Sequence, residues 1–228
     1  MIPDVILNHT PDAIELAKGE IQISRSNAKI VRDAFITLTH PDRVKLMQLI
    51  YESETQELTV TQLYIGARIE QSVASQHLRR LRTFLVVNPR PDGKEIYYSV
   101  DETFKLQIET AAAMISRDKT YETAINICRA LNNERRIEIL QYLDSWGPKT
   151  VGSIYRWKVW EQSATSIDLR DLRNAGLVIV ESRGKNRYYQ VNYTQLKRVV
   201  NLINKLAEAI REGRASRPKS RRYGRRDK

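Results

Sequence analysis

Apolar residues recur at helical spacing in a series of stretches that are separated by capping and turn residues. The first such stretch predicts a helix that Ser26 can cap and that presents Ile30, Val31, Ala34 and Phe35 on one face. A second helix is expected to begin at His40-Pro41-Asp42, because proline fits a first helical turn and an acid suits its positive end. Its apolar stripe is Val44, Met47 and Ile50.

A short helix from Thr59 and a third helix from about Gln71 follow, and the pattern then changes to that of strands. The third helix is expected to bury Ala74, Leu78, Leu81 and Leu85. The apolar and aromatic runs 84–87 and 95–100 flank a turn sequence at 91–94, which predicts a β-hairpin. Pro89 and Pro91 lack an N–H group, so this hairpin is expected to be an exposed edge feature.

The same order of elements occurs twice because the sequence repeats itself. A shift of 91 residues aligns positions 59–101 with 150–192 and gives 17 identities in 43 positions without a gap. Upstream the offset is 93, so the second copy is two residues shorter in a loop. Its second helix is expected to start at Asn132 or Asn133 and to bury Ile137, Leu140 and Leu143. The last helix has a broad apolar face, expected to stop at Gly213, that consists of Leu196, Val199, Val200, Ile203, Leu206, Ala207 and Ile210.

Helix, helix, turn, helix, two-stranded wing and helix is the element order of a winged helix-turn-helix. The predicted fold class is therefore mainly α with small β-hairpin wings, arranged as two tandem winged helix-turn-helix domains. We expect an N-terminal extension at 1–24, the two domains at 25–117 and 118–212, and a basic disordered tail at 213–228. Each domain is long enough to bury a small core of its own.

Three segments of the first copy resemble the ArsR family of bacterial repressors. QSVASQHLRRLR at 71–82 is similar to the recognition helix of that family, GKEIYYSV at 93–100 to its wing, and HPDR at 40–43 to a helix start. The second copy repeats the pattern at 162–166 and 169–178. The resemblance implies a transcription regulator, in most such proteins a repressor, that binds double-stranded DNA. It also implies pairing through the first and last helices, either as a single-chain pseudo-dimer with two recognition helices in neighbouring major grooves or as a homodimer.

The polar face of residues 71–82 carries side chains that can read base edges. Glutamine pairs bidentately with adenine, arginine with guanine, and serine with several edges, while basic side chains at the wing contact phosphates. A solvated helix face is the alternative. The predicted DNA-binding residues of the first copy are Gln71, Ser72, Ser75, Gln76, Arg79, Arg82 and Lys94, with Arg90 at the base of the wing as a further phosphate contact.

The second copy departs from this pattern at three positions. Ile167 replaces Gln76, and Asp168 and Asp171 replace His77 and Arg80. Acids on this helix are expected to repel phosphate, although isoleucine can contact a thymine methyl. We therefore expect the first copy to read bases and the second to add backbone contacts. The predicted DNA-binding residues of the second copy are Gln162, Ser163, Ser166, Arg170, Arg173, Arg183, Lys185 and Arg187.

Charge adds two alternatives to a sequence-specific regulator. Of the formal net charge of +11, residues 213–228 contribute +7, from eight Lys or Arg and one acid. Such a tail suits nucleic acid or an anionic membrane surface, or it keeps the protein in solution. The chain is then either an architectural, non-specific DNA binder dominated by the tail, or a protein-interaction scaffold that kept the fold.

Several classes of site have no residues to support them. The single cysteine, Cys128, excludes an intramolecular disulfide, suits a reducing cytoplasm and is expected to be buried and inert. Residues 1–20 lack a signal-peptide pattern and no apolar run is long enough to cross a membrane, so we expect a cytoplasmic protein. Many ArsR-like repressors sense metals through cysteines before the recognition helix or through Asp/His clusters on the last helix, and neither set is present.

The remaining candidates for a site are few. His9, His40 and His77 occur at no ligand spacing, so neither a metal nor a cofactor is expected. No catalytic constellation or phosphate-binding glycine loop occurs, which predicts a protein that is not an enzyme. Trp146, Trp157 and Trp160 are expected to fill a core, with a ligand pocket as the alternative. Nothing in the sequence identifies an effector.

Overall fold

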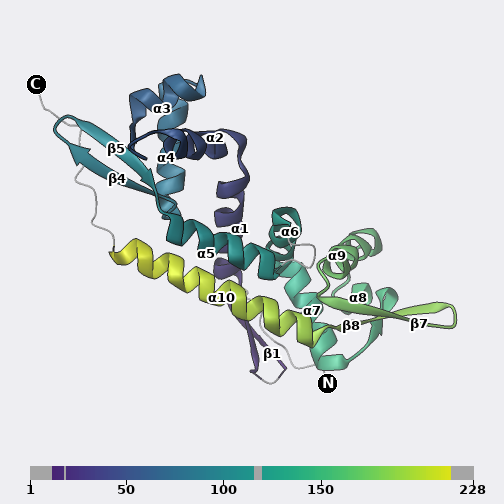
Figure 1. The fold of residues 1–228 in the computed structure, drawn as a ribbon. Coiled ribbons are helices and arrows are strands. Elements are labelled where there is room, and N and C mark those ends of the chain that lie inside the picture. Colours follow the sequence, from purple (N-terminus) through teal and green to yellow (C-terminus); the bar gives the residue numbers. More distant parts are fainter. Residues whose placement is uncertain (1–11, 18, 116–119, 217–228) are drawn as a thin grey trace, which may run out of the picture. The chain divides into compact units, whose positions relative to one another are not determined.

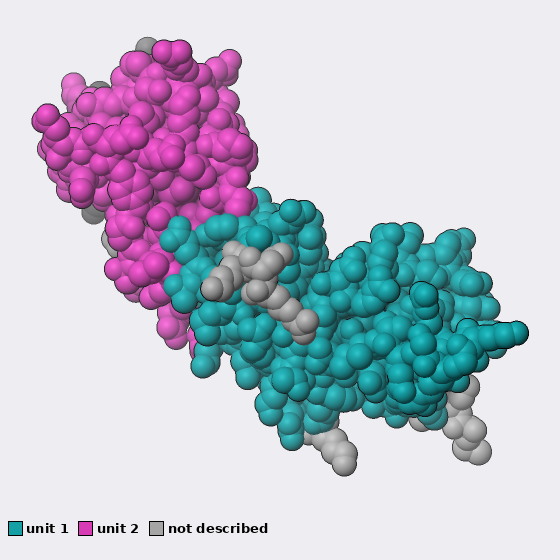
Figure 2. Space-filling view, turned by 45° about the vertical axis from the view of Figure 1, so that its right-hand side comes forward, with its two compact units in different colours: residues 1–36, 108–206 teal, residues 37–107, 207–228 magenta. Residues whose placement is uncertain are grey.

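The computed structural model describes residues 12–17, 19–115 and 120–216. The chain forms two compact units, coloured separately in Figure 2. Unit 1 combines residues 1–36 with 108–206 and holds the second copy of the repeat, whereas unit 2 combines 37–107 with 207–228 and holds the first copy. The domain limits expected at 25, 118 and 213 stay a prediction. Residues of both units belong to three helices, α1 (Arg25–Thr39), α5 (Glu102–Ile115) and α10 (Tyr193–Ser216).

Between α1 and α5, the first copy forms helices and a three-stranded antiparallel sheet (Figure 1). Its elements are α2 (Pro41–Glu52), β3 (Leu58–Thr59), α3 (Val60–Ala67), α4 (Gln71–Thr83), β4 (Val87–Asp92) and β5 (Glu95–Val100). The strand order is β3-β5-β4, so β4 lies at the edge and pairs Pro89 with Tyr98 and Pro91 with Ile96. The prediction that the two prolines lie on an edge strand is confirmed. One side of an edge strand has no partner strand, so a proline there removes no hydrogen bond from the sheet.

The second copy repeats this arrangement within unit 1 (Figure 1). Its elements are α6 (Tyr121–Leu131), α7 (Glu134–Trp146), β6 (Lys149–Thr150), α8 (Val151–Trp157), α9 (Gln162–Asn174), β7 (Val178–Arg183) and β8 (Asn186–Val191). The strand order β6-β8-β7 matches that of the first copy. Both wings turn through a Gly-Lys pair in which the glycine, Gly93 or Gly184, has a positive φ, as tight hairpins require.

The buried residues of α4 and α7 are those of the predicted apolar stripes, whereas the stripe of α2 differs by one residue. Ala74, Leu78 and Leu81 are buried on α4, and Ile137, Leu140 and Leu143 on α7. On α2 the buried residues are Arg43, Leu46, Met47 and Ile50, so Val44 is only half-buried and the prediction for that residue is wrong. The inward stripe of α2 begins one residue earlier than Val44.

The N-terminal extension contains a hairpin that the sequence pattern did not predict. Strands β1 (Ala13–Leu16) and β2 (Ile21–Ser24) pair antiparallel and bury Ile14, Leu16, Ile21 and Ile23. Asp12 accepts a hydrogen bond from the Ser26 backbone N–H at 2.9 Å and another from the Ser26 hydroxyl. Ser24, the residue before α1, accepts from the Asn27 N–H at 3.2 Å and is the N-cap, Asp12 is a further acceptor, and Ser26, the expected cap, lies inside the first turn.

Helix α10 does not stop at Gly213, as expected, but continues to Ser216. A Cβ at Gly213 would collide with the Leu85 Cδ1 atom and would lie 3.3 Å from the Phe104 ring. Glycine is needed here for a close approach within unit 2 and not as a helix terminator. The expected apolar face of α10 is buried over all seven predicted residues.

Candidate nucleic-acid interface

Helix α4 is positioned by the short helix before it. Thr59 caps α3 by accepting from the Gln62 backbone N–H at 3.3 Å, and the Gln62 side chain accepts from the Thr59 N–H at 2.9 Å. Arg68 then adopts a left-handed conformation with φ 56°, which turns the chain into α4. Because the inward stripe of α4 is fully buried, its opposite face is fixed toward solvent.

The exposed face of α4 carries the polar side chains that the sequence predicts to read DNA. Arg82 is half-buried, and Lys94 is exposed in the loop of the wing. The remaining five are exposed: Gln71, Ser72, Ser75, Gln76 and Arg79. The structure thus brings them onto one helix face, while their contact with DNA stays a prediction.

Arg90, expected to contact phosphate, is engaged within the wing. Its Nε donates to Glu57 Oε2 at 3.0 Å, its Nη1 donates to Asp92 Oδ2 at 3.3 Å, and its guanidinium lies over the Tyr97 ring. Two carboxylates therefore balance its charge. Hydrogen bonding to Arg90 also holds the pKa of the Glu57 carboxyl below its usual value.

The second copy exposes a comparable set of side chains. On α9, Gln162, Ser163, Ser166, Arg170 and Arg173 are exposed, and Ile167 is 47% exposed beside them. On the second wing Lys185 and Arg187 are exposed, whereas the exposed Arg183 donates to Glu181 at 2.8 Å and lies over the Tyr188 ring. The exposed cations of this copy are thus spread over both helix and wing.

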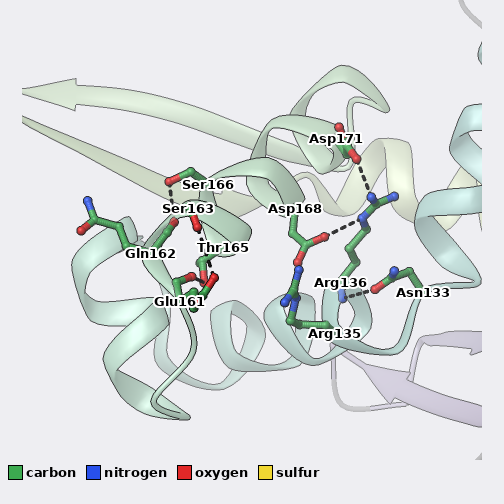
Figure 3. A network of polar contacts seen from close by, with 10 residues as sticks. All are labelled: Asn133, Arg135, Arg136, Glu161, Gln162, Ser163, Thr165, Ser166, Asp168 and Asp171. Atoms are coloured by element: carbon green, nitrogen blue, oxygen red, sulfur yellow. Dashed lines mark hydrogen bonds and ion pairs between the residues drawn. The ribbon is translucent and has the colours of Figure 1, made fainter.

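Asp168 does not face outward, and its expected role in repelling phosphate is wrong. Its side chain is 3% exposed and accepts from the guanidinium groups of Arg135 and Arg136 on α7, the latter at 3.0 Å (Figure 3). Asp171 is half-buried and pairs with the same Arg136. Both acids of α9 therefore neutralise partly exposed arginines and hold α9 against α7.

At three of the four equivalent positions the first copy carries a different type of charged or titratable residue. Position 42 corresponds to 135 and position 77 to 168, so the Arg135–Asp168 pair of the second copy becomes Asp42–His77 in the first. Likewise Asp171 becomes Arg80, and Arg43, the counterpart of Arg136, is buried with Nε and Nη1 unpartnered among the described residues. Burial, and then the charge of Arg80, lowers the pKa of Arg43.

The structure also corrects two expectations outside the interface. His40 and His77 match no ligand spacing in the sequence, but their ring centroids lie 4.6 Å apart and Asp42 lies beside them. His9 is outside the described residues. The tryptophans do not fill a core: Trp146 is 64% and Trp157 40% exposed, and Trp157 stacks on Tyr142. Cys128 is fully buried, as expected, and burial raises the pKa of its thiol.

These features define the class of the protein. Each copy places a 13-residue helix after a shorter helix and before a two-stranded antiparallel wing, which is the winged helix-turn-helix fold. Residues 133–180 match the family model described as bacterial regulatory protein, arsR family, and this segment is an ArsR-family helix-turn-helix domain. The matched residues lie in the second copy, so the resemblance of the first copy to this family comes from its sequence motifs at 40–43, 71–82 and 93–100.

Two curated relatives are described as transcriptional repressors. The transcriptional repressor PagR of Bacillus anthracis is 37% identical over 65 residues, which are 28% of this chain. A homologue of the transcriptional repressor SmtB from Synechocystis sp. is 29% identical over 86 residues, 38% of this chain. The chain spans 63% of the length of each of these relatives.

A solution structure of a homodimeric winged helix-turn-helix DNA-binding domain from Mycobacterium bovis is 26% identical. That match covers 38% of this chain and 80% of the other, with a TM-score of 0.33. Among the described residues, no helix has the length and apolar character needed to cross a membrane.

Proposed function

We propose that this protein is a sequence-specific, double-stranded DNA-binding regulator of transcription and that it acts as a repressor. The observation that carries the proposal is the exposed polar face of α4, whose opposite face is buried. Five side chains able to hydrogen-bond base edges lie on it, beside a wing with an exposed Lys94. Such a helix fits the major groove while the wing contacts the backbone.

The second copy adds a second recognition helix with a different chemistry. Because Asp168 is paired inside the domain, it does not oppose a phosphate backbone. Arg170, Arg173 and the three wing cations supply backbone contacts, and Ile167 offers an apolar contact for a thymine methyl. We infer that the first copy reads bases and the second adds mainly sequence-independent affinity, which favours an asymmetric site.

We further propose that the two copies act as a pseudo-dimer within one chain. Two recognition helices then enter neighbouring major grooves, whose centres lie about 34 Å apart on one face of the duplex. A homodimer with four wings is the competing arrangement. Light scattering of the DNA complex distinguishes one chain per site from two.

The decisive experiment is a selection from randomised duplexes, carried out with the full chain and with a chain that ends at Ser216. Ending there retains all described residues of α10 and removes most of the basic tail. A sequence motif that survives the truncation supports the regulator. Binding without sequence preference that vanishes with the tail identifies an architectural binder, and no binding by either chain identifies an interaction scaffold.

A further inference from the structure

Three potential metal ligands meet where the start of α2 faces the middle of α4 in unit 2. His40 immediately precedes α2 and makes no side-chain capping hydrogen bond, and Asp42 lies in the first turn of that helix. His77 reaches them from α4, 35 residues further along the chain than Asp42. One ligand atom from each of the three lies within 4.8 Å of the other two.

We propose that His40, Asp42 and His77 form a binding site for a divalent transition-metal ion of the zinc type. Two imidazoles and a carboxylate are a donor set that such ions accept, with the remaining coordination position left to water. The site goes beyond DNA recognition, because it uses none of the side chains on the exposed face of α4.

The distances fit this donor set. The His77 Nε2 and Asp42 Oδ2 atoms are 3.3 Å apart. Zinc bonds of about 2.0–2.2 Å at a tetrahedral angle separate neighbouring ligand atoms by about 3.3–3.5 Å. Two of the three ligands are therefore already at the spacing of a bound ion, and a ligand atom of His40 lies within 4.8 Å of both.

The environment of His40 favours a ligand over a salt-bridge partner. Its Nδ1 atom is buried and has no hydrogen-bond partner among the described residues. Asp42 is 39% exposed, so an ion and its water ligand can reach the site from solvent.

The second copy shows what the same positions look like when they serve packing alone. Asn133, Arg135 and Asp168 occupy the places of His40, Asp42 and His77, and Arg135 binds Asp168 directly. A contact that holds the two helices together at this place therefore needs no pair of histidines. The competing explanation for the first copy is that Asp42 and His77 form only such a contact, with the acid and the base exchanged between the helices.

A cobalt titration of the full chain, freed of metal by a chelator, separates the two accounts. Co²⁺ replaces zinc in such sites and its d–d absorption reports nitrogen and oxygen ligands in a tetrahedral field. We expect one Co²⁺ per chain, displaced by Zn²⁺, and at least a tenfold weaker affinity in both His40→Ala and His77→Gln. His9→Ala, which changes the third histidine of the chain, is the matched control and should bind as the wild type does.

The double substitution D42R/H77D guards against loss of folding, because it installs the ion pair that the second copy already uses. It should keep the wild-type circular dichroism and melting temperature but lose Co²⁺ binding. Absence of saturable binding to the wild type, or equal affinity in the wild type and the two histidine variants, would overturn the proposal. These measurements do not involve DNA, so a negative result would not argue against the proposed regulatory function. The duplex selection tests that function separately.

Discussion

The carboxylate of Asp168 lies 3.0 Å from the Nε atom of Arg136, with the Arg135 guanidinium on its other oxygen. These contacts join α9 to α7 within the second copy (Figure 3). Asp168 therefore stabilises the packing of the two helices, because it faces inward and its charge is already neutralised.

Replacing Asp168 with alanine should destabilise the protein without strengthening DNA binding. Asp168 is buried, but the arginines it leaves behind are partly exposed and Arg136 keeps Asp171, so the loss costs about 1–3 kcal/mol. Thermal unfolding should shift down by roughly 5 °C. Asp92→Ala, which removes an exposed carboxylate near Arg90, is the control and should change the melting temperature little. Tighter DNA binding with an unchanged melting temperature would restore the idea that Asp168 repels phosphate.

Arg79→Ala and Lys185→Ala should weaken DNA binding in different ways. Loss of a bidentate arginine contact to guanine relaxes preference at one base position by about 1–3 kcal/mol. Loss of a phosphate contact at the wing weakens all sequences alike and reduces the salt dependence by about one charge. Affinities for a selected site and for single-base variants, measured at several salt concentrations, separate the two. The reverse assignment would show that the division of labour between the copies is wrong.

Within the first wing, Lys94→Ala should reduce affinity more than Arg90→Ala. Lys94 is exposed in the loop, whereas Arg90 is already bound to Glu57 and Asp92. An arginine with two carboxylate partners offers less charge to a phosphate. The two substitutions remove the same formal charge a few residues apart, so each controls for the other in a fluorescence-anisotropy titration. A larger loss for Arg90→Ala contradicts the prediction.

Gly213→Ala should destabilise the protein although alanine is the better helix former. The new methyl group meets Leu85, and overpacking of this kind costs about 1–3 kcal/mol. The gain in helix propensity is only about 1 kcal/mol. In the Leu85→Ala background the same substitution should be neutral or stabilising, since the obstructing side chain is gone. Additive effects in this double-mutant cycle, measured by urea denaturation, would show that the two residues do not meet.

The Cys128 thiol should be unreactive in the folded protein even at pH 9. Burial raises its pKa well above the usual range, so the nucleophilic thiolate is not populated until the chain unfolds. The unfolded state loses this proton at about pH 8.5, so the contribution of Cys128 to stability is present below that pH and falls as pH rises above it. A colorimetric thiol reagent should react only after denaturant is added. Rapid labelling of the native protein would contradict this.

Much of the fold could be worked out from the sequence because its signals are local. Helical spacing of Ala74, Leu78 and Leu81 indicated which face of α4 points inward, and therefore which polar side chains remain outside. Two prolines placed β4 at a sheet edge, and the internal repeat carried each inference from one copy to the other. Periodicity and backbone chemistry act over a few residues, so a single chain read in order contains them.

Tertiary structure alone decided which residues distant in the sequence face one another. Asp168 and Arg136 are 32 residues apart, Asp42 and His77 are 35 apart, and Gly213 and Leu85 are 128 apart, and no local pattern relates the members of these pairs. Whether an acid repels a phosphate or neutralises an arginine depends on which helix packs against it. The exposure of Trp146 likewise depends on which parts of the chain pack near it. The cost of burying a charge and the gain from pairing it are also fixed only once the helices are packed.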